Sequence, residues 1–344
     1  MAKEVVLTGL RANAEFHLGN YLGGILPMVQ LQKKHAGKYQ LNMFIPDLHS
    51  FTTPIDHGKL YEQTHKNLKY FVAAGLDIDQ PDTFIYRQSY IPAHSELTWI
   101  LDCFTGFGEM SRMTEFKDKA AQIGEDRISI GLFNYPVLMA ADILIYSAKY
   151  VPVGEDQRQH VEFARDIAVR INNKFGDIFV LPSDNAGQLK FAGREKPVRI
   201  RSLRNPDKKM SKSVEDPAGT VMLSDSPEEA VKKIIEATTD SLAKINSDFE
   251  RQPGVANLLQ ILALLTGASQ SKVNNEWGGK SSYGELKRAV ADAVSSFLKE
   301  LQDKLAAIDD KKLMQKLEAD EEAMRKVADA TLLKVQKAVG LRPV

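Results

Sequence analysis

The feature that most constrains the fold is the alternation of short apolar runs with longer helical patterns through the first two-thirds of the chain. Runs of about three to six mostly apolar residues, separated by helical stretches of roughly 10 to 20 residues, are typical of parallel strands in βαβ units. The expected strands lie at 5–7, 43–45, 83–86, 151–153 and 178–181, and the expected helices at 19–34, 59–74, 96–104, 128–147 and 157–175. The pattern predicts an α/β fold with a Rossmann-like, doubly wound parallel sheet.

The character of the sequence changes after Pro217, where strand-like runs nearly vanish. Helical patterns follow at 227–237, 255–265, 283–308 and 311–339, with charged residues interleaved on one face and Ala, Leu and Val on the other. A length of 344 residues is also typical of about two domains. We therefore expect an α/β domain over residues 1–218 and an all-α domain over residues 219–344.

Composition excludes several classes of protein. The 45 basic and 45 acidic side chains give no net charge, so a polyanion would have to be met by a local basic surface. The single cysteine, Cys103, excludes an intrachain disulfide framework and a Cys-rich zinc site, and it favours a reducing compartment. The N-terminal apolar run is too short for a signal peptide, and the most apolar stretch, 130–146, contains Asn134, Pro136 and Asp142. We expect a cytoplasmic protein without a membrane span.

The first chemical motif, His17-Leu18-Gly19-Asn20, lies between the first expected strand and the following helix. In a doubly wound sheet this junction forms a crevice for a nucleotide, because free backbone N–H groups and the helix dipole favour phosphate. Gly19 would let a backbone or a base approach closely. Taken alone, His17 is more typical of a turn or a helix cap than of a binding site.

The second motif, Lys208-Lys209-Met210-Ser211-Lys212-Ser213, places three ammonium groups and two hydroxyls in one short loop between the two regions. Such a loop can supply mobile positive charge and hydrogen-bond donors to a developing pyrophosphate. A solvated basic loop is the plain alternative, and composition alone does not decide between the two.

With both motifs in this order, the chain resembles the class I aminoacyl-tRNA synthetases. Residues 17–20 are similar to their HIGH signature, and residues 209–213 match their KMSKS signature. The segments YPVLMAADIL at 135–144 and VPVGEDQRQH at 151–160 resemble those of bacterial-type tryptophanyl-tRNA synthetases, and RMTEFKDK at 112–119 is a further match. The resemblance covers essentially the whole chain. It implies ATP-dependent activation of L-tryptophan to tryptophanyl-adenylate and transfer to tRNA(Trp), with release of AMP and diphosphate.

The same resemblance assigns roles to the two regions. Residues 1–218 would form the catalytic domain with a connective insertion, ending in the KMSKS loop. Residues 219–344 would form a helical domain that recognises the tRNA anticodon. Mg²⁺ would be bound through the ATP phosphates, without a protein metal motif. The chain would be a homodimer that does not contact a membrane.

The resemblance implies four catalytic residues, namely Lys209, Lys212, Lys119 and Asn20. In-line attack of an already ionised carboxylate on the α-phosphate requires positioning and charge stabilisation more than a protein nucleophile. One stretch departs from the family, because RANA at 11–14 stands where most relatives have Gln-Pro-Ser/Thr-Gly. The residues implied to bind ATP are Arg11, Ala12, Asn13, Gly19, Asn20, Gly154, Glu155, Asp156, Ile200, Lys209, Met210, Ser211, Lys212 and Ser213.

The pocket for the amino-acid side chain would be built around Asp142. An indole offers one N–H donor and no acceptor, so a buried carboxylate that accepts this hydrogen bond suits tryptophan. Met139, on the same helix face, would pack against the ring, with plain core packing as its alternative. The residues implied to bind tryptophan are Asp142, Met139, Tyr135, Gln157, His49, Leu7 and Gly9.

Three other functions compete with this interpretation. A tyrosyl-tRNA synthetase shares the fold and the reaction, but its signature normally ends in His where this chain has Asn20. A small-molecule nucleotidyltransferase would share the first motif, yet the complete KMSKS loop and the helical C-terminal region argue against it. A catalytically silent nucleotide-binding protein is disfavoured, because every charged group expected along the phosphate path is present.

Overall fold

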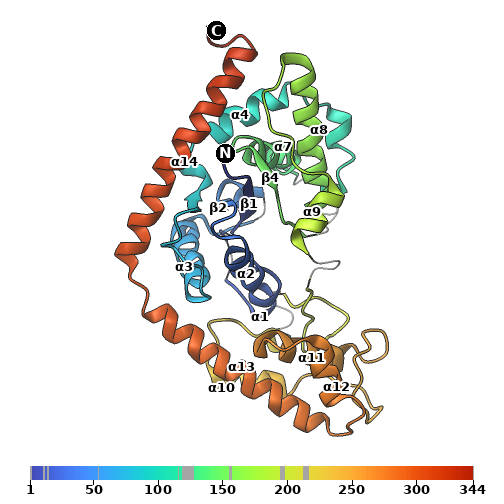
Figure 1. The fold of residues 1–344 in the computed structure, drawn as a ribbon. Coiled ribbons are helices and arrows are strands. Elements are labelled where there is room, and N and C mark those ends of the chain that lie inside the picture. Colours follow the sequence, from blue (N-terminus) through green and yellow to red (C-terminus); the bar gives the residue numbers. More distant parts are fainter. Residues whose placement is uncertain are drawn as a thin grey trace.

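A parallel four-stranded sheet forms the centre of the molecule (Figure 1). The computed structural model describes residues 2–10, 12–13, 15–52, 54–114, 116–117, 128–154, 157–193, 198–211 and 217–343. Within these ranges the strands are β1 (Val5–Gly9), β2 (Gln40–Ile45), β3 (Thr83–Arg87) and β4 (Ala148–Tyr150), in the order β3-β2-β1-β4. Every pair of neighbouring strands is parallel. The predicted Rossmann-like α/β fold is confirmed.

Alternate residues of the central strands face two separate apolar cores. Met43 and Ile45 of β2 pack with the helices of one face, whereas Phe44 packs with those of the other. The first core contains residues of α2 (Leu26–His35) and α3 (Leu60–Ala73). The second contains residues of α4 (Ala93–Asp102), α7 (Ile130–Leu144) and α8 (Arg158–Phe175). The sheet is therefore covered on both faces, which explains its nearly continuous apolar strands.

Two of the expected strands were wrong. The fourth strand, β4, begins at Ala148 rather than Val151, and the N–H group of Val151 donates instead to Oε1 of Gln188 at 2.9 Å. The following proline has no N–H group to contribute to a sheet. The segment 178–181 is not a strand, because Asn172 takes its backbone groups: Oδ1 accepts from the N–H groups of Ile178 and Phe179 at 3.1 and 2.9 Å.

The expected helices of the first two-thirds are confirmed, with small shifts at their ends. The first is composite, since α1 (Leu18–Asn20) continues through a π-helical segment (Tyr21–Ile25) into α2. Two short helices were not predicted, α5 (Phe107–Met110) and α9 (Asn185–Ala192). Among the described residues, no helix is long and apolar enough to span a bilayer.

Four C-terminal helices gather at one end of the molecule (Figure 1). They are α10 (Pro227–Ile235), α11 (Pro253–Thr266), α12 (Gln270–Trp277) and α13 (Tyr283–Ala306), of which only α12 was not predicted. Helix α13 packs against both α10 and α11 and also contacts α3. The expected C-terminal helical region is therefore present, although the boundary after residue 218 stays a prediction.

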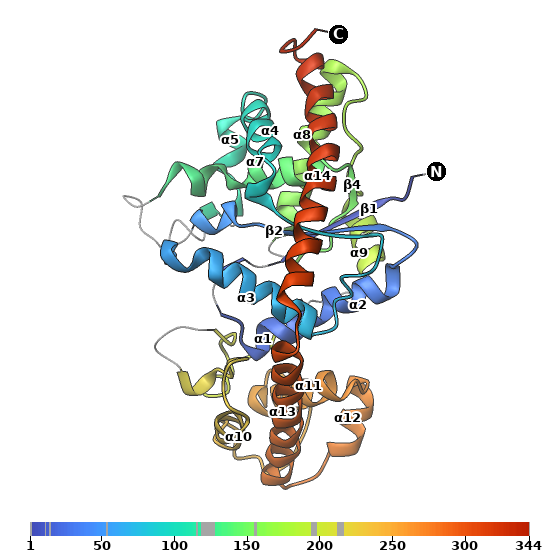
Figure 2. The same ribbon diagram turned by 90° about the vertical axis from the view of Figure 1, so that its left-hand side faces the viewer.

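The last helix, α14 (Asp310–Ala338), packs against β3 and α4 of the first two-thirds of the chain, so the C-terminal region is not a self-contained unit. It leaves the other C-terminal helices and runs back along the edge of the sheet (Figure 2). Side chains of α14 form hydrogen bonds with backbone groups at the outer edge of β3. Lys316 Nζ donates to the carbonyl oxygen of Thr83 at 3.0 Å, and Asp320 Oδ2 accepts from the N–H group of Ile85 at 2.8 Å. Glu321 accepts from the N–H group of Arg87 at 3.2 Å. Alternate residues of β3 thus bond to a helix where another strand would otherwise pair.

Candidate active site

A cavity of about 1040 Å³ opens at the carboxyl ends of the strands, where β1 lies between β2 and β4. This central cavity lies at the switch point of the sheet, the usual ligand position in doubly wound folds. Its wall includes the ends of β1 and β2, the short helix Leu48–Thr52, one face of α7 and the segment 151–154 after β4. The opposite wall comes from α2 and α9.

Ten of the predicted site residues line the central cavity. All seven residues expected to bind tryptophan are among them, together with three expected to bind ATP. They are Leu7, Gly9, His49, Tyr135, Met139, Asp142, Gln157, Ala12, Asn13 and Gly154. The roles of these residues stay predictions, but the sequence-based selection converges on one cavity. Six further predicted residues, Arg11, Lys119, Glu155, Asp156, Lys212 and Ser213, lie outside the described residues.

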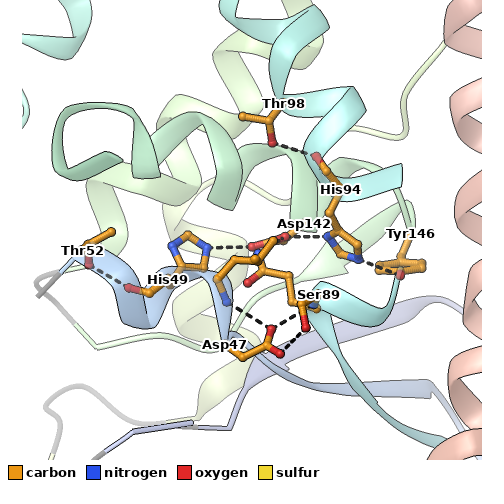
Figure 3. Close-up of polar contacts among 10 residues, drawn as sticks. Asp47, His49, Thr52, Ser89, His94, Thr98, Asp142 and Tyr146 are labelled. Carbon is orange, nitrogen blue, oxygen red and sulfur yellow. Dashed lines mark hydrogen bonds and ion pairs between the residues drawn. The ribbon is translucent and has the colours of Figure 1, made fainter. Parts of the chain in front are cut away.

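Asp142 is the most deeply buried charged group in this wall, with no exposed surface. It lies on α7, a helix that begins where the hydroxyl of Ser129 accepts from the N–H group of Leu132. Two donors reach Oδ1: Nε2 of Gln88 at 2.8 Å and Nδ1 of His94 at 2.6 Å (Figure 3). One donor, Nε2 of His49, reaches Oδ2 at 2.9 Å. The burial cost of this carboxylate is therefore offset by an array of hydrogen bonds.

The same contacts set the charge of Asp142. Burial alone would raise its pKa, but the hydrogen bonds that His49 and His94 donate to the carboxylate outweigh that effect and lower the pKa. Asp142 is consequently an ionised acceptor at neutral pH. A carboxylate offers about four acceptor positions, and among the contacts of the described residues Oδ1 has two donors whereas Oδ2 has one, His49, so more acceptor capacity remains on Oδ2.

The three donors approach Asp142 from different sides. His49 lines the central cavity and its side chain is 18% exposed, whereas Gln88 and His94 are fully buried and do not line the cavity. His94 is held in turn by Tyr146, whose hydroxyl lies 2.9 Å from Nε2. Oδ1 is thus bound from the protein interior, and Oδ2 is bound from the cavity.

Two further contacts fix the walls near Asp142. Asp47, at the end of β2, accepts from the N–H group of Ser89 at 2.9 Å and also bonds to the Ser89 hydroxyl, which ties the loop carrying His49 to the end of β3 (Figure 3). Nε2 of His160 lies 2.9 Å from the hydroxyl of Tyr135. Tyr135 is therefore oriented by α8 as well as by its own helix.

The first motif forms a helix cap beside the central cavity. Nδ1 of His17 accepts from the N–H group of Asn20 at 3.2 Å, while Oδ1 of Asn20 accepts from the N–H group of His17 at 3.1 Å. His17 thus has the capping role that was its simpler interpretation. Gly19 packs closely: a Cβ at this position would lie 3.0 Å from the His17 ring and 3.5 Å from Ile200. Neither Gly19 nor Asn20 lines the cavity itself.

The second motif begins as one side of a short hairpin. The N–H group of Met210 donates to the carbonyl oxygen of Ile200 at 3.0 Å, and the carbonyl oxygen of Lys208 accepts from Ser202 at 2.9 Å. Met210 and Ile200 are buried in the apolar core and do not line the cavity, so their expected contact with ATP stays a prediction. Lys209 and Ser211 are exposed at the surface. This hairpin places residues 208–211 near the short helix after His17, because Ile200 pairs with Met210 and lies beside Gly19.

Comparison with known proteins decides the family. A model of the class I tRNA synthetases (W and Y) matches residues 2–299. The chain belongs to this family. The tryptophan–tRNA ligase of Caldanaerobacter subterraneus subsp. tengcongensis is 42% identical over 336 residues, which cover 98% of each chain. That of Corynebacterium glutamicum is 43% identical over 338 residues, covering 97% of this chain and 94% of the relative.

Solved structures of class I synthetases agree with this membership. The tryptophanyl-tRNA synthetase of Mycoplasma pneumoniae superimposes with a TM-score of 0.82 at 35% identity, covering 99% of this chain and 98% of that one. The enzyme from Campylobacter jejuni, solved in complex with ADP and tryptophan, gives a TM-score of 0.76 at 33% identity, covering 98% of this chain and 99% of that one.

Sequence reasoning missed two residues that surround Asp142, namely Gln88 and His94. Gln88 directly follows β3 and His94 is near the start of α4. Polar residues just after a parallel strand lie at the edge where class I synthetases and other doubly wound proteins bind ligands. The position of Gln88 and His94 after β3 therefore indicates in the sequence that this segment lies near a ligand site. It does not indicate that both side chains bind Asp142.

Proposed function

We infer that this chain is a tryptophan–tRNA ligase. It activates L-tryptophan with ATP to tryptophanyl-adenylate and transfers the tryptophanyl group to tRNA(Trp), releasing AMP and diphosphate. The observation that carries this proposal is Asp142, an ionised and fully buried acceptor at the wall of the central cavity. Close similarity to tryptophan–tRNA ligases over nearly the whole chain supports it.

Asp142 accounts for the choice of amino acid. The indole of tryptophan presents a single N–H donor, and Oδ2 of Asp142 has acceptor capacity left on the cavity side. Met139 and Tyr135 lie in the same wall and offer apolar surface to the ring. A substrate without the N–H group would leave a buried carboxylate with an unused acceptor, which a site of this kind rejects strongly.

The activation step requires charge and positioning. The tryptophan carboxylate attacks the α-phosphate of ATP, the new acyl–phosphate bond forms, and pyrophosphate leaves with the electron pair of the broken bond. Lys209, Lys212 and Lys119 would stabilise the negative charge that grows on the pyrophosphate. Asn20 would contact the ATP. Gly154 and the residues 155–156 would hold the adenosine.

Mg²⁺ is the expected counter-ion of ATP. The described residues contain no group of three or more His, Cys, Asp or Glu side chains that could form a protein metal site. We expect phosphate oxygens and water to bind the ion, because Mg²⁺ prefers oxygen ligands and retains much of its hydration. No step is assigned to a protein-bound metal.

Two partners belong to the same proposal. The helices α10 to α13 would contact the anticodon arm of tRNA(Trp). A second copy of the chain would cover Phe51 and Trp99, which line one shallow pocket and are 57% and 72% exposed. Exposed aromatic side chains that lie together are typical of an interface. Replacing Trp99 by Glu should convert a dimer to a monomer in light scattering.

Aminoacylation tests the proposed function directly. Purified protein should charge total bacterial tRNA with labelled tryptophan and ATP, and it should not charge it with labelled tyrosine. Charging with tyrosine alone would assign the chain to the other branch of its family. Formation of an adenylate without any charging of tRNA would favour a small-molecule nucleotidyltransferase.

A further inference from the structure

Asp142 is the end of a buried chain of hydrogen bonds that reaches well behind the substrate pocket. His94 on α4 bridges Asp142 and Tyr146, with Nδ1 at 2.6 Å from Oδ1 of Asp142 and Nε2 at 2.9 Å from the Tyr146 hydroxyl (Figure 3). Asp142 and His94 have no exposed surface, and Tyr146 is 2% exposed. Neither His94 nor Tyr146 lines the central cavity, so neither can touch a ligand there.

We propose that His94 and Tyr146 are positioning residues, which hold Asp142 as an ionised acceptor and keep Oδ2 turned toward the cavity for the N–H group of a bound indole. This inference rests on the proposed function, because it concerns how the same carboxylate recognises tryptophan. It assigns to two residues behind the pocket a part in amino-acid specificity.

The direction of each hydrogen bond follows from the chemistry of the partners. An ionised carboxylate only accepts, so Nδ1 of His94 must carry a proton and donate it to Oδ1 of Asp142. With that proton on Nδ1, Nε2 is the ring nitrogen left to accept, and the hydroxyl of Tyr146, 2.9 Å away, is positioned to donate to it. Burial raises the pKa of Tyr146, so this hydroxyl keeps its proton. Tyr146 thereby fixes the tautomer of His94, as second partners of functional histidines generally do.

The opposite tautomer would change what the pocket can bind. With its proton on Nε2, His94 would point the lone pair of Nδ1 at Oδ1 of Asp142, and the carboxyl group would have to take up a proton to remain there. A protonated carboxyl has one donor of its own and fewer acceptor positions. The pocket would then lose its selectivity for a ligand that only donates.

The geometry also fixes the orientation of the carboxylate. Gln88 and His94 both bind Oδ1, so that oxygen is held toward the interior and Oδ2 must face the other way. Oδ2 accepts from His49, the donor of these three that lines the cavity. If the carboxylate of Asp142 rotated, Oδ2 would no longer face the cavity, even though the residues that line the cavity were unchanged.

Binding measurements with two ligands separate positioning from general support of the fold. L-Tryptophan is compared with its benzothiophene analogue, in which sulfur replaces the indole N–H group. A hydrogen bond to a charged acceptor corresponds to about 10- to 100-fold in affinity, so the wild-type protein should prefer tryptophan by that factor. Calorimetric titration of the full-length protein gives both dissociation constants.

His94→Leu should weaken tryptophan binding about tenfold or more while changing the affinity for the analogue less than threefold. His94→Asn places an amide donor near the former position of Nδ1 and should restore binding of tryptophan to within about threefold. Tyr146→Phe, which removes one hydroxyl and keeps the ring, should reduce the preference for tryptophan by about three- to tenfold. Tyr70→Phe, a buried tyrosine on α3 in the other core, is the matched control and should leave the preference unchanged.

Three outcomes would overturn the inference: equal loss of affinity for both ligands in His94→Leu and Tyr146→Phe, an unchanged preference for tryptophan in both, or an Asn variant as weak as the Leu variant. Tyr146→Phe keeps the test valid if the Leu variant does not fold, since it removes a single oxygen atom. Failure of the proposed function looks different, because the wild-type protein would then not bind tryptophan at all.

Discussion

Glu321 holds the last helix to the edge of the sheet, and its removal is a strong test of that contact. Its carboxylate binds the Arg87 guanidinium through two bonds, of 2.6 Å to Nε and 2.9 Å to Nη2, and both side chains are less than 10% exposed. Burial would lower the pKa of Arg87, but Glu321 outweighs this and raises it. Removing one partner of such a pair leaves an uncompensated buried charge, which costs about 3–5 kcal/mol. We expect Glu321→Ala to destabilise the protein by that amount.

Thermal unfolding measures this loss. The entropy of unfolding is about 2.1 cal/mol/K per residue near 60 °C, or about 0.7 kcal/mol/K for 344 residues, so the loss corresponds to a fall in Tm of about 4–7 °C. The double variant Arg87→Met, Glu321→Leu removes both charges and should recover most of the difference. Glu318→Ala, at an exposed position of the same helix, is the control and should change Tm by less than about 1 °C. A fall in the Tm of Glu321→Ala no larger than that of the control would show that the buried pair of Arg87 and Glu321 does not stabilise the fold.

Three further predictions concern the site and the pH dependence of stability. Asp142→Ala should raise the KM for tryptophan about 10- to 100-fold and leave the Kd of ATP for the free enzyme within about twofold; equal damage to both would contradict the indole assignment. Lys212→Ala should slow adenylate formation with little effect on tryptophan affinity, and an unchanged rate of pyrophosphate exchange would argue against the role of the loop. The Arg170 guanidinium holds the pKa of Glu109 below its usual value of 4.5, so the stability from this pair is present above that pH and is lost as the pH falls through the folded pKa. Wild type should therefore lose more free energy of unfolding than Glu109→Gln when the pH falls through this range, as measured by urea unfolding. The difference should be about 1 kcal/mol or less, because both groups are about one-third exposed.

The sequence predicted the elements of the fold better than their packing. Apolar periodicity located β1 to β3 and most of the helices, because burial on one or both faces leaves a local pattern. The position of α14 has no such local signal: an amphipathic pattern shows that one face is buried, but not what covers it. Asp320 and Glu321 are indistinguishable in sequence from solvated helix charges, yet they are buried against the edge of β3.

The site shows the same limit. Asp142 was found because a carboxylate within an apolar helix is costly unless it is paired or functional. Its partners His94 and Gln88 are separated from it by 48 and 54 residues, and only the folded sheet brings them together. Met210 is part of a functional signature and also a core residue, so a motif match alone does not show which of its side chains reach a ligand. Residues of the signature that face a cavity can be told from those that face the core only in three dimensions.

We propose that the cavity around Asp142 selects tryptophan for activation by ATP. The decisive experiment for this selection is ATP–pyrophosphate exchange, measured with each of the twenty standard amino acids in turn. Tryptophan alone should stimulate exchange, and Asp142→Ala should lose most of this stimulation at limiting tryptophan. Stimulation by tyrosine alone, or by no amino acid, would contradict it.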